Sequence, residues 1–353
     1  MSPRPRATVA LVAERANVSV ASVSRVLNGQ PASPELAARV RQAASELGYV
    51  PDASARSLKV RRTEQLALAV ADVGNPVYVS MMRAVETVVK AANYRLLLSS
   101  VGSDPDDEVA LLASLAHGYA DGLILSPLRV TPALLDGLAA ALVPVVVVGT
   151  LPRGVPVDNV RVNSGRGVGL VVRHLAETGR RSIGLLNGPV DTVPGAARQR
   201  GFERAMRELG LPSSPALRVA AADFTFAAGR EAAGRLLDGA KLDGLVCAND
   251  LLAVGAVNVL TERGLAVPDD VAVSGMDGTE LAELYAPPLT TVDLGATDRG
   301  RIAAELLLDR LRRPDVEPRR VTVAPRLIVR ASTAPVGRSG STAQRGRNAR
   351  TPR

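Results

Sequence analysis

The sequence of 353 residues predicts a small all-α helix-turn-helix domain followed by an α/β core of two doubly wound parallel-sheet subdomains. Three observations lead to this prediction. Residues 1–50 contain three short helical patterns separated by tight turns. From residue 63 onward, short apolar runs alternate with helical stretches. Charge divides the chain at the same place, because residues 1–62 hold ten Lys/Arg and four Asp/Glu, whereas residues 63–333 hold 28 basic and 31 acidic residues.

The composition limits the class of protein. Hydrophobic residues make up 46% of the chain and are spread throughout, as in a globular protein. A single cysteine excludes an internal disulfide framework and fits a reducing cytoplasm. We expect no signal peptide and no membrane span, since no apolar run is long enough. These features predict a cytoplasmic protein without a membrane partner.

The basic head, residues 1–50, contains clear signals for three helices. Thr8 is suited to cap the first helix, and Asn17 tolerates the left-handed conformation of the tight turn that follows it. The second helix spans Ser19–Asn28. The third begins at Ser33-Pro34-Glu35 and ends at Gly48. Two short helices joined by a tight turn, and then a third, predict a helix-turn-helix domain.

The second helix has an apolar stripe and a polar face. Ser19 is a good N-cap, and the stripe consists of Val20, Val23, Val26 and Leu27. Small side chains allow close approach to DNA, hydroxyls and amides bond phosphates, and arginine can grip guanine with two hydrogen bonds. The alternative is an ordinary amphipathic helix. The basic charge of the head favours a polyanionic partner. The residues off the stripe are Ala21, Ser22, Ser24, Arg25 and Asn28.

The run TVALVAERANVSVASVSRVLNG, followed by GYVPDASARSLKV, closely resembles the DNA-binding head of the LacI/GalR family of bacterial repressors. The resemblance implies that Val20 and Ala21 select operator bases and that Arg25 helps to read the half-site. Valine and alanine side chains donate no hydrogen bond, so they offer only apolar contacts, for instance to a thymine methyl. Leu11 and Asn17 stand where the family often has Asp and usually has Gly, and neither should prevent the fold. The implied phosphate contacts are Ser22, Ser24 and Asn28, and Ser19 at the start of the helix is predicted to belong to the same DNA-binding surface.

Residues 51–62 read as a polar linker on their own, but Asp52–Val60 resembles the hinge helix of the same family. The resemblance implies that Leu58 is a wedge between the central base pairs of the operator. Ala55 lies one turn earlier, and Lys59 matches a minor-groove or phosphate contact. Because a short isolated helix is marginal in water, we expect the hinge to order on DNA or in a closed dimer.

The body, residues 63–333, repeats a strand and helix pattern that is typical of parallel sheets with helices on both faces. Its length favours two similar subdomains. The predicted helices are 79–92, 106–117, 196–209 and 251–263. The predicted strands are 66–70, 95–99, 122–126, 145–148, 183–186, 244–248 and 271–275.

The body resembles the periplasmic-binding-protein-like effector core of the LacI/GalR family in VADVGNPVY, ADGLILSP, ARQRGF, CANDLLAVGA and DVAVSGMDGTELAELYAPPLTTV. The resemblance implies one subdomain at about 63–160 and 293–322. It implies a second at about 161–292 and 323–333, with an effector in the cleft between them.

The effector pocket is expected at the carboxyl ends of the strands, where ligands bind in such folds. Any polar residue there can instead cap the next helix, and the Asn75-Pro76 step can simply shape its turn. An Arg and an Asp facing a cleft can hold vicinal hydroxyls through charge-assisted bonds, and a Phe can stack on a sugar ring. Gly149 departs from several members, which place a ligand-contacting Asp there. The positions carried over are Asn75, Val77, Tyr78, Ser126, Arg198, Phe224, Asn249 and Asp277.

Other candidate signals carry less weight. Gly165, Gly167 and Gly169 resemble a fragment of a dinucleotide-binding loop, but the spacing is GxGxG and no suitable acid follows. The two histidines, His117 and His174, have no plausible metal ligands near them in the sequence. Cys247 lies in an apolar strand, as a buried thiol does. We therefore expect no cofactor, no metal and no enzymatic activity.

The sequence thus favours a DNA-binding transcriptional regulator, a repressor, controlled by a small-molecule effector such as a sugar or a related metabolite. The basic tail, residues 334–353, is expected to be disordered and has no leucine heptad, so we predict a homodimer on double-stranded operator DNA. A transporter's solute-binding protein would share the body but lack the head. An enzyme on the same scaffold would need a catalytic constellation.

Overall fold

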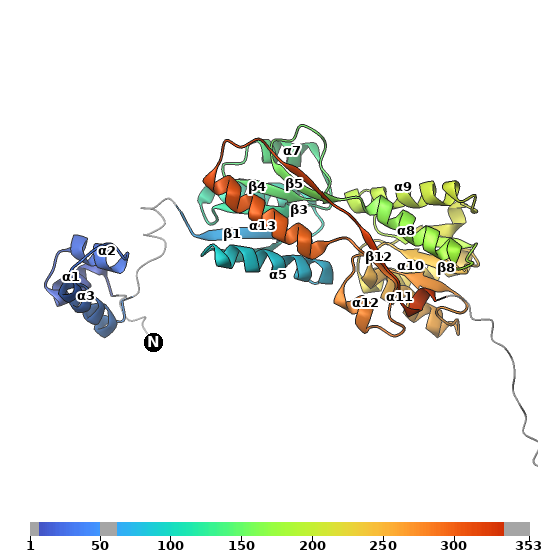
Figure 1. The fold of residues 1–353 in the computed structure, drawn as a ribbon, viewed down its shortest axis with the longest axis horizontal. Helices are drawn as coiled ribbons and strands as arrows, with labels where there is room; N and C mark the ends of the chain where they lie inside the picture. The colour runs from blue at the N-terminus through green and yellow to red at the C-terminus, as the bar shows by residue number, and fades with distance from the viewer. Residues whose placement is uncertain (1–6, 50–61, 335–353) are drawn as a thin grey trace, which may run out of the picture. The chain divides into compact units, whose positions relative to one another are not determined.

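The computed structural model describes residues 7–49 and 62–334, which fall into two compact units, Met1–Thr63 and Glu64–Arg353 (Figure 1). The hinge residues Ala55, Leu58 and Lys59 lie outside the described residues, and so does the tail from residue 335 onward.

The first unit contains the three predicted helices, α1 (Val9–Ala16), α2 (Val20–Leu27) and α3 (Pro34–Leu47). Both predicted helix ends are confirmed. Asn17 adopts the left-handed conformation at φ 52° after α1, and Gly48 does so at φ 60° after α3. The core of this unit joins all three helices through small buried side chains: Val12, Ala13, Ala16, Val23, Val26, Val40, Ala43 and Ala44.

The prediction that Val20 belongs to the buried apolar stripe of α2 is wrong. Val20 is 47% exposed, whereas Val23 and Val26 are buried. The buried stripe therefore begins at Val23, because the core of the three helices takes up the later part of α2 and leaves its first turn open to solvent.

The second unit has two lobes, seen in Figure 1 as separate groups of strands and helices. The first lobe is built on a six-stranded parallel sheet in the order β11-β5-β4-β3-β1-β2. Its strands are β1 (Gln65–Val70), β2 (Arg95–Ser100), β3 (Gly122–Ser126), β4 (Val145–Val148), β5 (Asp158–Val162) and β11 (Arg320–Val323).

Helices cover both faces of the six-stranded sheet because side chains alternate between two apolar cores. Leu66 and Leu68 of β1 face one core, and Ala67 and Ala69 face the other. The first core includes α5 (Pro76–Ala91) and α13 (Ala296–Arg312). The second includes α6 (Pro105–Ser114), η1 (Leu115–His117) and α7 (Pro132–Ala139).

The second lobe is built on a four-stranded parallel sheet in the order β7-β6-β8-β9. Helices α8 and α9 cover one face, and α10 and α11 cover the other. The strands are β6 (Ile183–Asn187), β7 (Arg218–Ala220), β8 (Gly244–Cys247) and β9 (Ala272–Ser274). The helices are α8 (Ser164–Glu177), α9 (Val193–Glu208), α10 (Phe226–Gly239), α11 (Asp250–Glu262) and the short α12 (Glu280–Leu284).

All seven predicted strands and all four predicted body helices are confirmed to within a few residues. The chain passes between the lobes after β5, around β10, and between β11 and β12; Figure 1 shows the last of these segments running from one lobe to the other. There β10 (Thr291–Asp293) and β12 (Arg326–Ile328) pair antiparallel, so two of the passages support each other.

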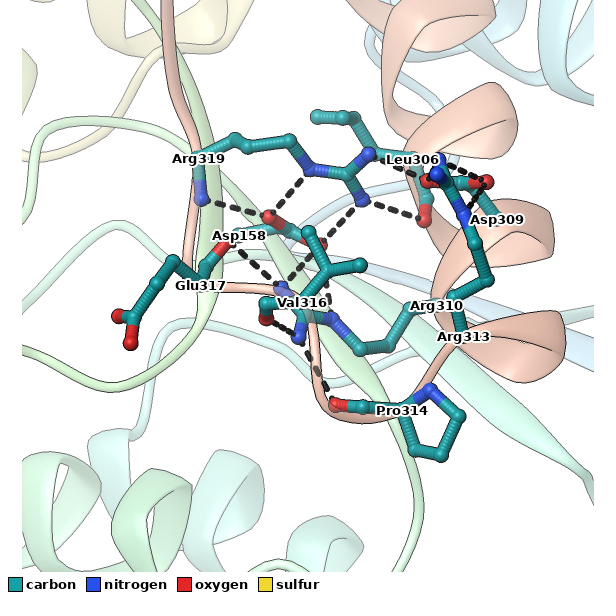
Figure 2. Close-up of polar contacts among 9 residues, drawn as sticks. All are labelled: Asp158, Leu306, Asp309, Arg310, Arg313, Pro314, Val316, Glu317 and Arg319. Atoms are coloured by element: carbon teal, nitrogen blue, oxygen red, sulfur yellow. Dashed lines mark hydrogen bonds and ion pairs between the residues drawn. The ribbon is translucent and has the colours of Figure 1, made fainter.

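The buried carboxylate of Asp158 joins three segments of the first lobe (Figure 2). Asp158, at the start of β5, accepts hydrogen bonds from Arg319 at 2.7, 3.1 and 3.0 Å and from Arg310 at 3.2 and 3.1 Å. Arg319 also pairs with Asp309 at 2.5 Å, and Arg313 pairs with the same carboxylate at 2.6 Å. The network ties the end of α13 and the chain entering β11 to β5.

Across residues 7–49 and 62–334, no helix combines the length and the apolar character that crossing a membrane requires.

Candidate functional site

Helix α2 presents its first turn and one side to solvent. Among the described residues, the Arg25 guanidinium forms no hydrogen bond or ion pair. A free cation beside small side chains makes a surface that can approach a polyanion closely. The exposed side chains are Ser19, Val20, Ala21, Arg25 and Asn28, and the partly exposed ones are Ser22 and Ser24.

Two of the predicted DNA-contacting residues also serve the helix itself. Ser19 Oγ accepts a hydrogen bond from the Ser22 backbone N–H at 3.1 Å, and the two hydroxyl oxygens lie 3.0 Å apart. Asn28 donates to the Ser24 carbonyl at 2.7 Å. The predicted N-cap role of Ser19 is therefore confirmed, and the side chains of Ser22 and Ser24 remain partly accessible.

The turn between α1 and α2 is fixed by a residue that the sequence interpretation missed. Arg39 of α3 donates to the carbonyls of Ala16 and Asn17 at 2.6 and 3.0 Å. Arg15 of α1 also pairs with Glu46 of α3 at 2.7 Å. Both contacts join α3 to the first helix and its turn, so they help to set the angle at which α2 is presented.

A cleft with two adjoining chambers lies between the lobes of the second unit. The first chamber has a volume of about 110 Å³ and the second about 330 Å³, and Tyr78 and Leu128 line both. Of the predicted effector residues, the second chamber brings together Asn75, Tyr78 and Phe224. The first brings together Val77, Tyr78, Ser126, Arg198 and Asp277.

Arg198 and Asp277 form a buried pair in the first chamber. Arg198 Nη2 lies 3.5 Å from Asp277 Oδ1, and both residues are more than nine-tenths buried. The guanidinium carbon lies 5.6 Å from the centre of the Phe224 ring, within cation–π range. The backbone of Asp277 has φ 113°, a conformation that residues other than glycine rarely adopt, and such outliers gather at functional sites.

Burial dominates the acid–base properties of the first chamber. It raises the pKa of Asp277 to about 7, although the Arg198 charge opposes the shift. Burial and the Asp277 charge also raise the pKa of Tyr78 to about 12, so the phenol stays neutral. The same burial lowers the pKa of Arg198. Charged groups held with so little solvation are suited to receive a polar ligand.

Arg299, in the first turn of α13, also lines this chamber and is a site residue that the sequence interpretation missed. It is 8% exposed. The signal that could have found it is its spacing from Ala303 and Leu307, since all three lie on the buried face of α13.

Asn249 lines neither chamber. Its Oδ1 accepts the Leu252 N–H at 2.8 Å, which caps α11, and its Nδ2 donates to the Phe224 carbonyl at 2.9 Å. Both ends of the amide are used inside the protein, so the structure places Asn249 behind Phe224. Asn75 lines the second chamber and also caps α5 through the Val77 N–H at 3.2 Å.

Contacts between the lobes close one side of the cleft. Arg129, after β3, pairs with Asp191 of the second lobe at 2.8 Å and donates to the Ser103 carbonyl at 2.7 Å. The Val193 N–H donates to the Leu128 carbonyl at 2.8 Å. Because Arg129–Asp191 and Val193–Leu128 cross between the lobes, a change in the angle between the lobes must strain or break them.

The glycine run in α8 has a packing role. A Cβ on Gly201 of α9 would lie 2.3 Å from the Gly165 carbonyl oxygen, and one on Gly165 would lie 2.7 Å from the Ala197 carbonyl oxygen. These glycines therefore allow α8 and α9 to touch along their backbones.

The remaining candidate ligands are bonded or buried. Within the part of the chain that the structure describes, no group of His, Cys, Asp and Glu could hold a metal ion. His117 and His174 form hydrogen bonds with Ser114 and Thr333. Cys247 is fully buried in β8, so the prediction of a buried thiol is confirmed.

The comparisons with known proteins agree with this geometry. Residues 8–52 match the family described as bacterial regulatory proteins, lacI family, and residues 172–333 match a periplasmic binding protein-like domain. The chain is 36% identical over 342 residues to the HTH-type transcriptional regulator CelR of Thermobifida fusca, covering 94% of this chain and 100% of CelR. The chain belongs to the lacI family. It is a helix-turn-helix transcriptional regulator whose core has the fold of a periplasmic binding protein.

Two solved structures of this family are similar to the chain. A CelR–cellobiose complex has a TM-score of 0.70 at 34% identity and covers 93% of this chain and 100% of that one. The lac repressor dimer bound to operator and the anti-inducer ONPF has a TM-score of 0.82 at 25% identity, with 93% and 99% covered. The first bears a sugar, and the second bears operator DNA.

Proposed function

We propose that this protein is a repressor that binds double-stranded operator DNA as a homodimer in the cytoplasm, without enzymatic activity. Its effector would be a sugar or a related metabolite held between the two lobes. The observation that carries the proposal is the buried Arg198–Asp277 pair facing a cleft in a chain that also presents the open surface of α2. The operator-bound lac repressor dimer and the cellobiose-bound CelR support the two halves of the proposal.

The proposed switch works through the angle between the lobes. An effector that bridges Tyr78 and Ser126 of the first lobe to Arg198 of the second favours one angle over another. Only this difference in affinity for the two arrangements can shift the equilibrium. The bonds that Arg129 and Leu128 make across the cleft belong to one of the arrangements. The predicted hinge, with Leu58 as its wedge, would pass the change to the DNA.

The DNA half of the proposal is tested by selecting operators from a random duplex pool with the full chain. We expect an inverted repeat to be enriched. Arg25→Ala should weaken binding to the selected sequence by about 1–3 kcal/mol and relax the preference at one position of each half-site. Arg41→Ala, an exposed arginine of α3, is the matched control for loss of charge. Equal losses for the two variants would contradict the assigned role of Arg25.

The effector half is tested with a thermal-shift panel of sugars, nucleosides and purines, because a ligand that binds only the native state raises Tm. Arg198→Ala should abolish the response to the effector while operator binding persists in one state. Arg200→Ala, exposed two residues later on α9, is the matched control. If Arg198→Ala bound the effector as tightly as the unmodified chain, the pocket would be misplaced.

A further inference from the structure

Within residues 7–49 and 62–334, the side chain of Arg299 is buried in the cleft without a hydrogen-bonding partner. Its Nε has no hydrogen bond, and across the described residues its guanidinium forms no ion pair. Arg198 has an unpartnered Nε as well, and its contact with Asp277 is an ion pair at 3.5 Å. Burying a guanidinium without hydrogen bonds is costly, so a folded protein rarely retains one without a use.

Arg299 is not needed to anchor α13. The helix is held at its start by close packing, since a Cβ on Gly300 would lie 2.5 Å from the Met81 carbonyl oxygen of α5. It is held at its other end by the bonds from Arg310 to Asp158. An arginine with a structural role would be expected to bond a carbonyl or a carboxylate, as Arg310 does.

The charges that line the first chamber do not balance. Arg198 and Arg299 face one acid, Asp277, and Tyr78 is neutral. Gly149 lines the same chamber and adds no carboxylate. The positive charge of two guanidinium groups therefore exceeds the negative charge that the lining residues supply.

The two acids next to this group are already bonded. Asp250 accepts hydrogen bonds from Thr279 and Thr291, at 2.7 and 2.6 Å from their hydroxyls. Asp293 accepts the Gly295 N–H at 2.7 Å and pairs with Arg326 at 3.2 Å. Neither carboxylate forms a hydrogen bond with Arg198 or Arg299 among the described residues, although the Asp250 charge acts on Arg198 and the Asp293 charge acts on Arg299. The hydrogen-bonding capacity of both guanidinium groups is therefore left open to a ligand.

The second chamber has the opposite character. Asp72, Asn75 and Asp223 line it together with the Phe224 ring. Carboxylates and an amide beside an aromatic face suit hydroxyl groups on an apolar ring, as in a sugar. Tyr78 and Leu128 line both chambers, so one ligand can reach across the boundary.

We propose that the effector carries an anionic group, a carboxylate or a phosphate ester, which binds between Arg198 and Arg299 in the first chamber. Its hydroxyl-bearing body would extend toward Phe224 and the second chamber. The ligand class is thus an acidic or phosphorylated sugar, and Arg299 is the residue that selects it over a neutral sugar. This inference rests on the proposed function, since it concerns the same cleft.

The test compares matched neutral and anionic ligands on the full chain. Thermal shift and calorimetric titration would use cellobiose with cellobionate, and glucose with gluconate and glucose 6-phosphate. We expect at least one anion to bind at least about tenfold more tightly than its neutral partner. Arg299→Met should remove that preference, and Arg299→Lys, which keeps the charge, should retain part of it. The carboxylate and phosphate arms distinguish the two sources of charge.

The ligand-free variants give an independent readout. Replacing an unpaired buried cation with methionine should raise the Tm of the ligand-free protein, whereas a structural arginine would lower it on replacement. The proposal is overturned if Arg299→Met lowers that Tm, or if no anion distinguishes the unmodified chain from Arg299→Met. Operator selection with the unmodified chain distinguishes failure of this inference from failure of the proposed function. Its success without an anion preference rejects only this inference, and its failure rejects the proposed function.

Discussion

Two clusters in the core are built from the same residue types and are organised in opposite ways. Around Asp158, one buried carboxylate accepts five hydrogen bonds from Arg310 and Arg319 (Figure 2). Around Asp277, one buried carboxylate lies 3.5 Å from Arg198, and the guanidinium of the nearby Arg299 has no hydrogen bond among the described residues. The first cluster is complete within the protein. The second has unused hydrogen-bonding capacity that a ligand can fill.

The pKa values of the two carboxyls reflect this difference. Burial alone would raise the pKa of Asp158, but the hydrogen bonds from Arg319 and the nearby positive charges outweigh it and lower the pKa. At Asp277 burial outweighs the arginine charges and raises the pKa to about 7. The hydrogen bonds that each carboxyl accepts therefore decide whether the folded protein favours its ionised or its protonated form.

The largest expected effect is on the complete cluster. Asp158→Ala leaves Arg310 and Arg319 without their shared acceptor, and removing one partner of a buried ion pair costs about 3–5 kcal/mol in the free energy of unfolding. Urea denaturation of the full chain, followed by circular dichroism, measures this loss. Arg313→Ala is the matched control, because this largely exposed arginine joins the network through Asp309. A loss for Asp158→Ala no larger than that of the control would mean that the network does not hold the lobe together.

The next effect is the pH dependence of the incomplete cluster. Because the folded-state pKa of Asp277 is raised, its contribution to stability is full below about pH 4 and is lost as the pH rises to about 7. The free energy of unfolding of the ligand-free protein should therefore fall by roughly 2–4 kcal/mol over this range. Asp277→Asn should remove this part of the slope, and asparagine tolerates a positive φ better than most residues. Chemical denaturation at a series of pH values measures it.

Three other groups have shifted pKa values and must be separated from Asp277. Burial raises the pKa of Asp250, so its contribution has the same sign as that of Asp277. Burial also raises the pKa of Glu108 to about 7, so its contribution has the same sign, and Glu108→Gln identifies it. Burial lowers the pKa of His174, so its contribution has the opposite sign. The difference between the unmodified chain and Asp277→Asn cancels the contributions of Glu108 and His174. The Asp250 charge acts on Asp277, so the same difference is also measured in an Asp250→Asn background. If that difference did not change with pH, the Asp277 carboxyl would be ionised in the folded state.

A strand could be predicted from the sequence where its own residues carry the signal, and not where its place depends on distant residues. Most of the parallel strands are predicted correctly because burial on both faces makes them continuous apolar runs, as in VVVV at 145–148. Strand β5 lies inside the six-stranded sheet but is not among the predicted strands, because Asp158, Asn159 and Arg161 interrupt its apolar pattern. The edge strands β7 and β11 are also missed, since RVA and RVTV are short and lack the continuous apolar run that the edge strand β2 has in RLLLSS. Their place in a sheet depends on pairing partners far away in the sequence.

The site was predicted only as far as local signals reach. Arg198 and Asp277 were found through a family resemblance, and the structure brings them together. Arg299 lies in a helix rich in arginine, and its i, i+4, i+8 spacing with Ala303 and Leu307 predicts burial but does not show what the side chain faces. The packing of α13 beside α5 places the side chain of Arg299 in the cleft. Capping of the next helix was the stated alternative for strand-end residues, and Asn249 adopts it, but no local signal shows its bond to the Phe224 carbonyl 25 residues away.

The smallest expected effect concerns Asn249. Replacing this residue tests whether it contacts the ligand or only supports the residues that line the cleft. Loss of an N-cap costs about 1 kcal/mol, so Asn249→Ala should lower the free energy of unfolding by roughly that amount. Effector affinity should fall only a few-fold, since the bond to the Phe224 carbonyl is lost but the ring remains. Urea denaturation and calorimetric titration measure the two effects.

A serine at the same position separates the two bonds of the Asn249 amide. Asn249→Ser should restore the cap at α11 without restoring the bond to Phe224, so its stability should return while its effector affinity stays slightly reduced. If both variants kept normal stability and lost the effector completely, Asn249 would contact the ligand directly. The ligand-binding surface would then extend past Phe224 to the start of α11. The cleft would reach further into the second lobe than its two chambers do.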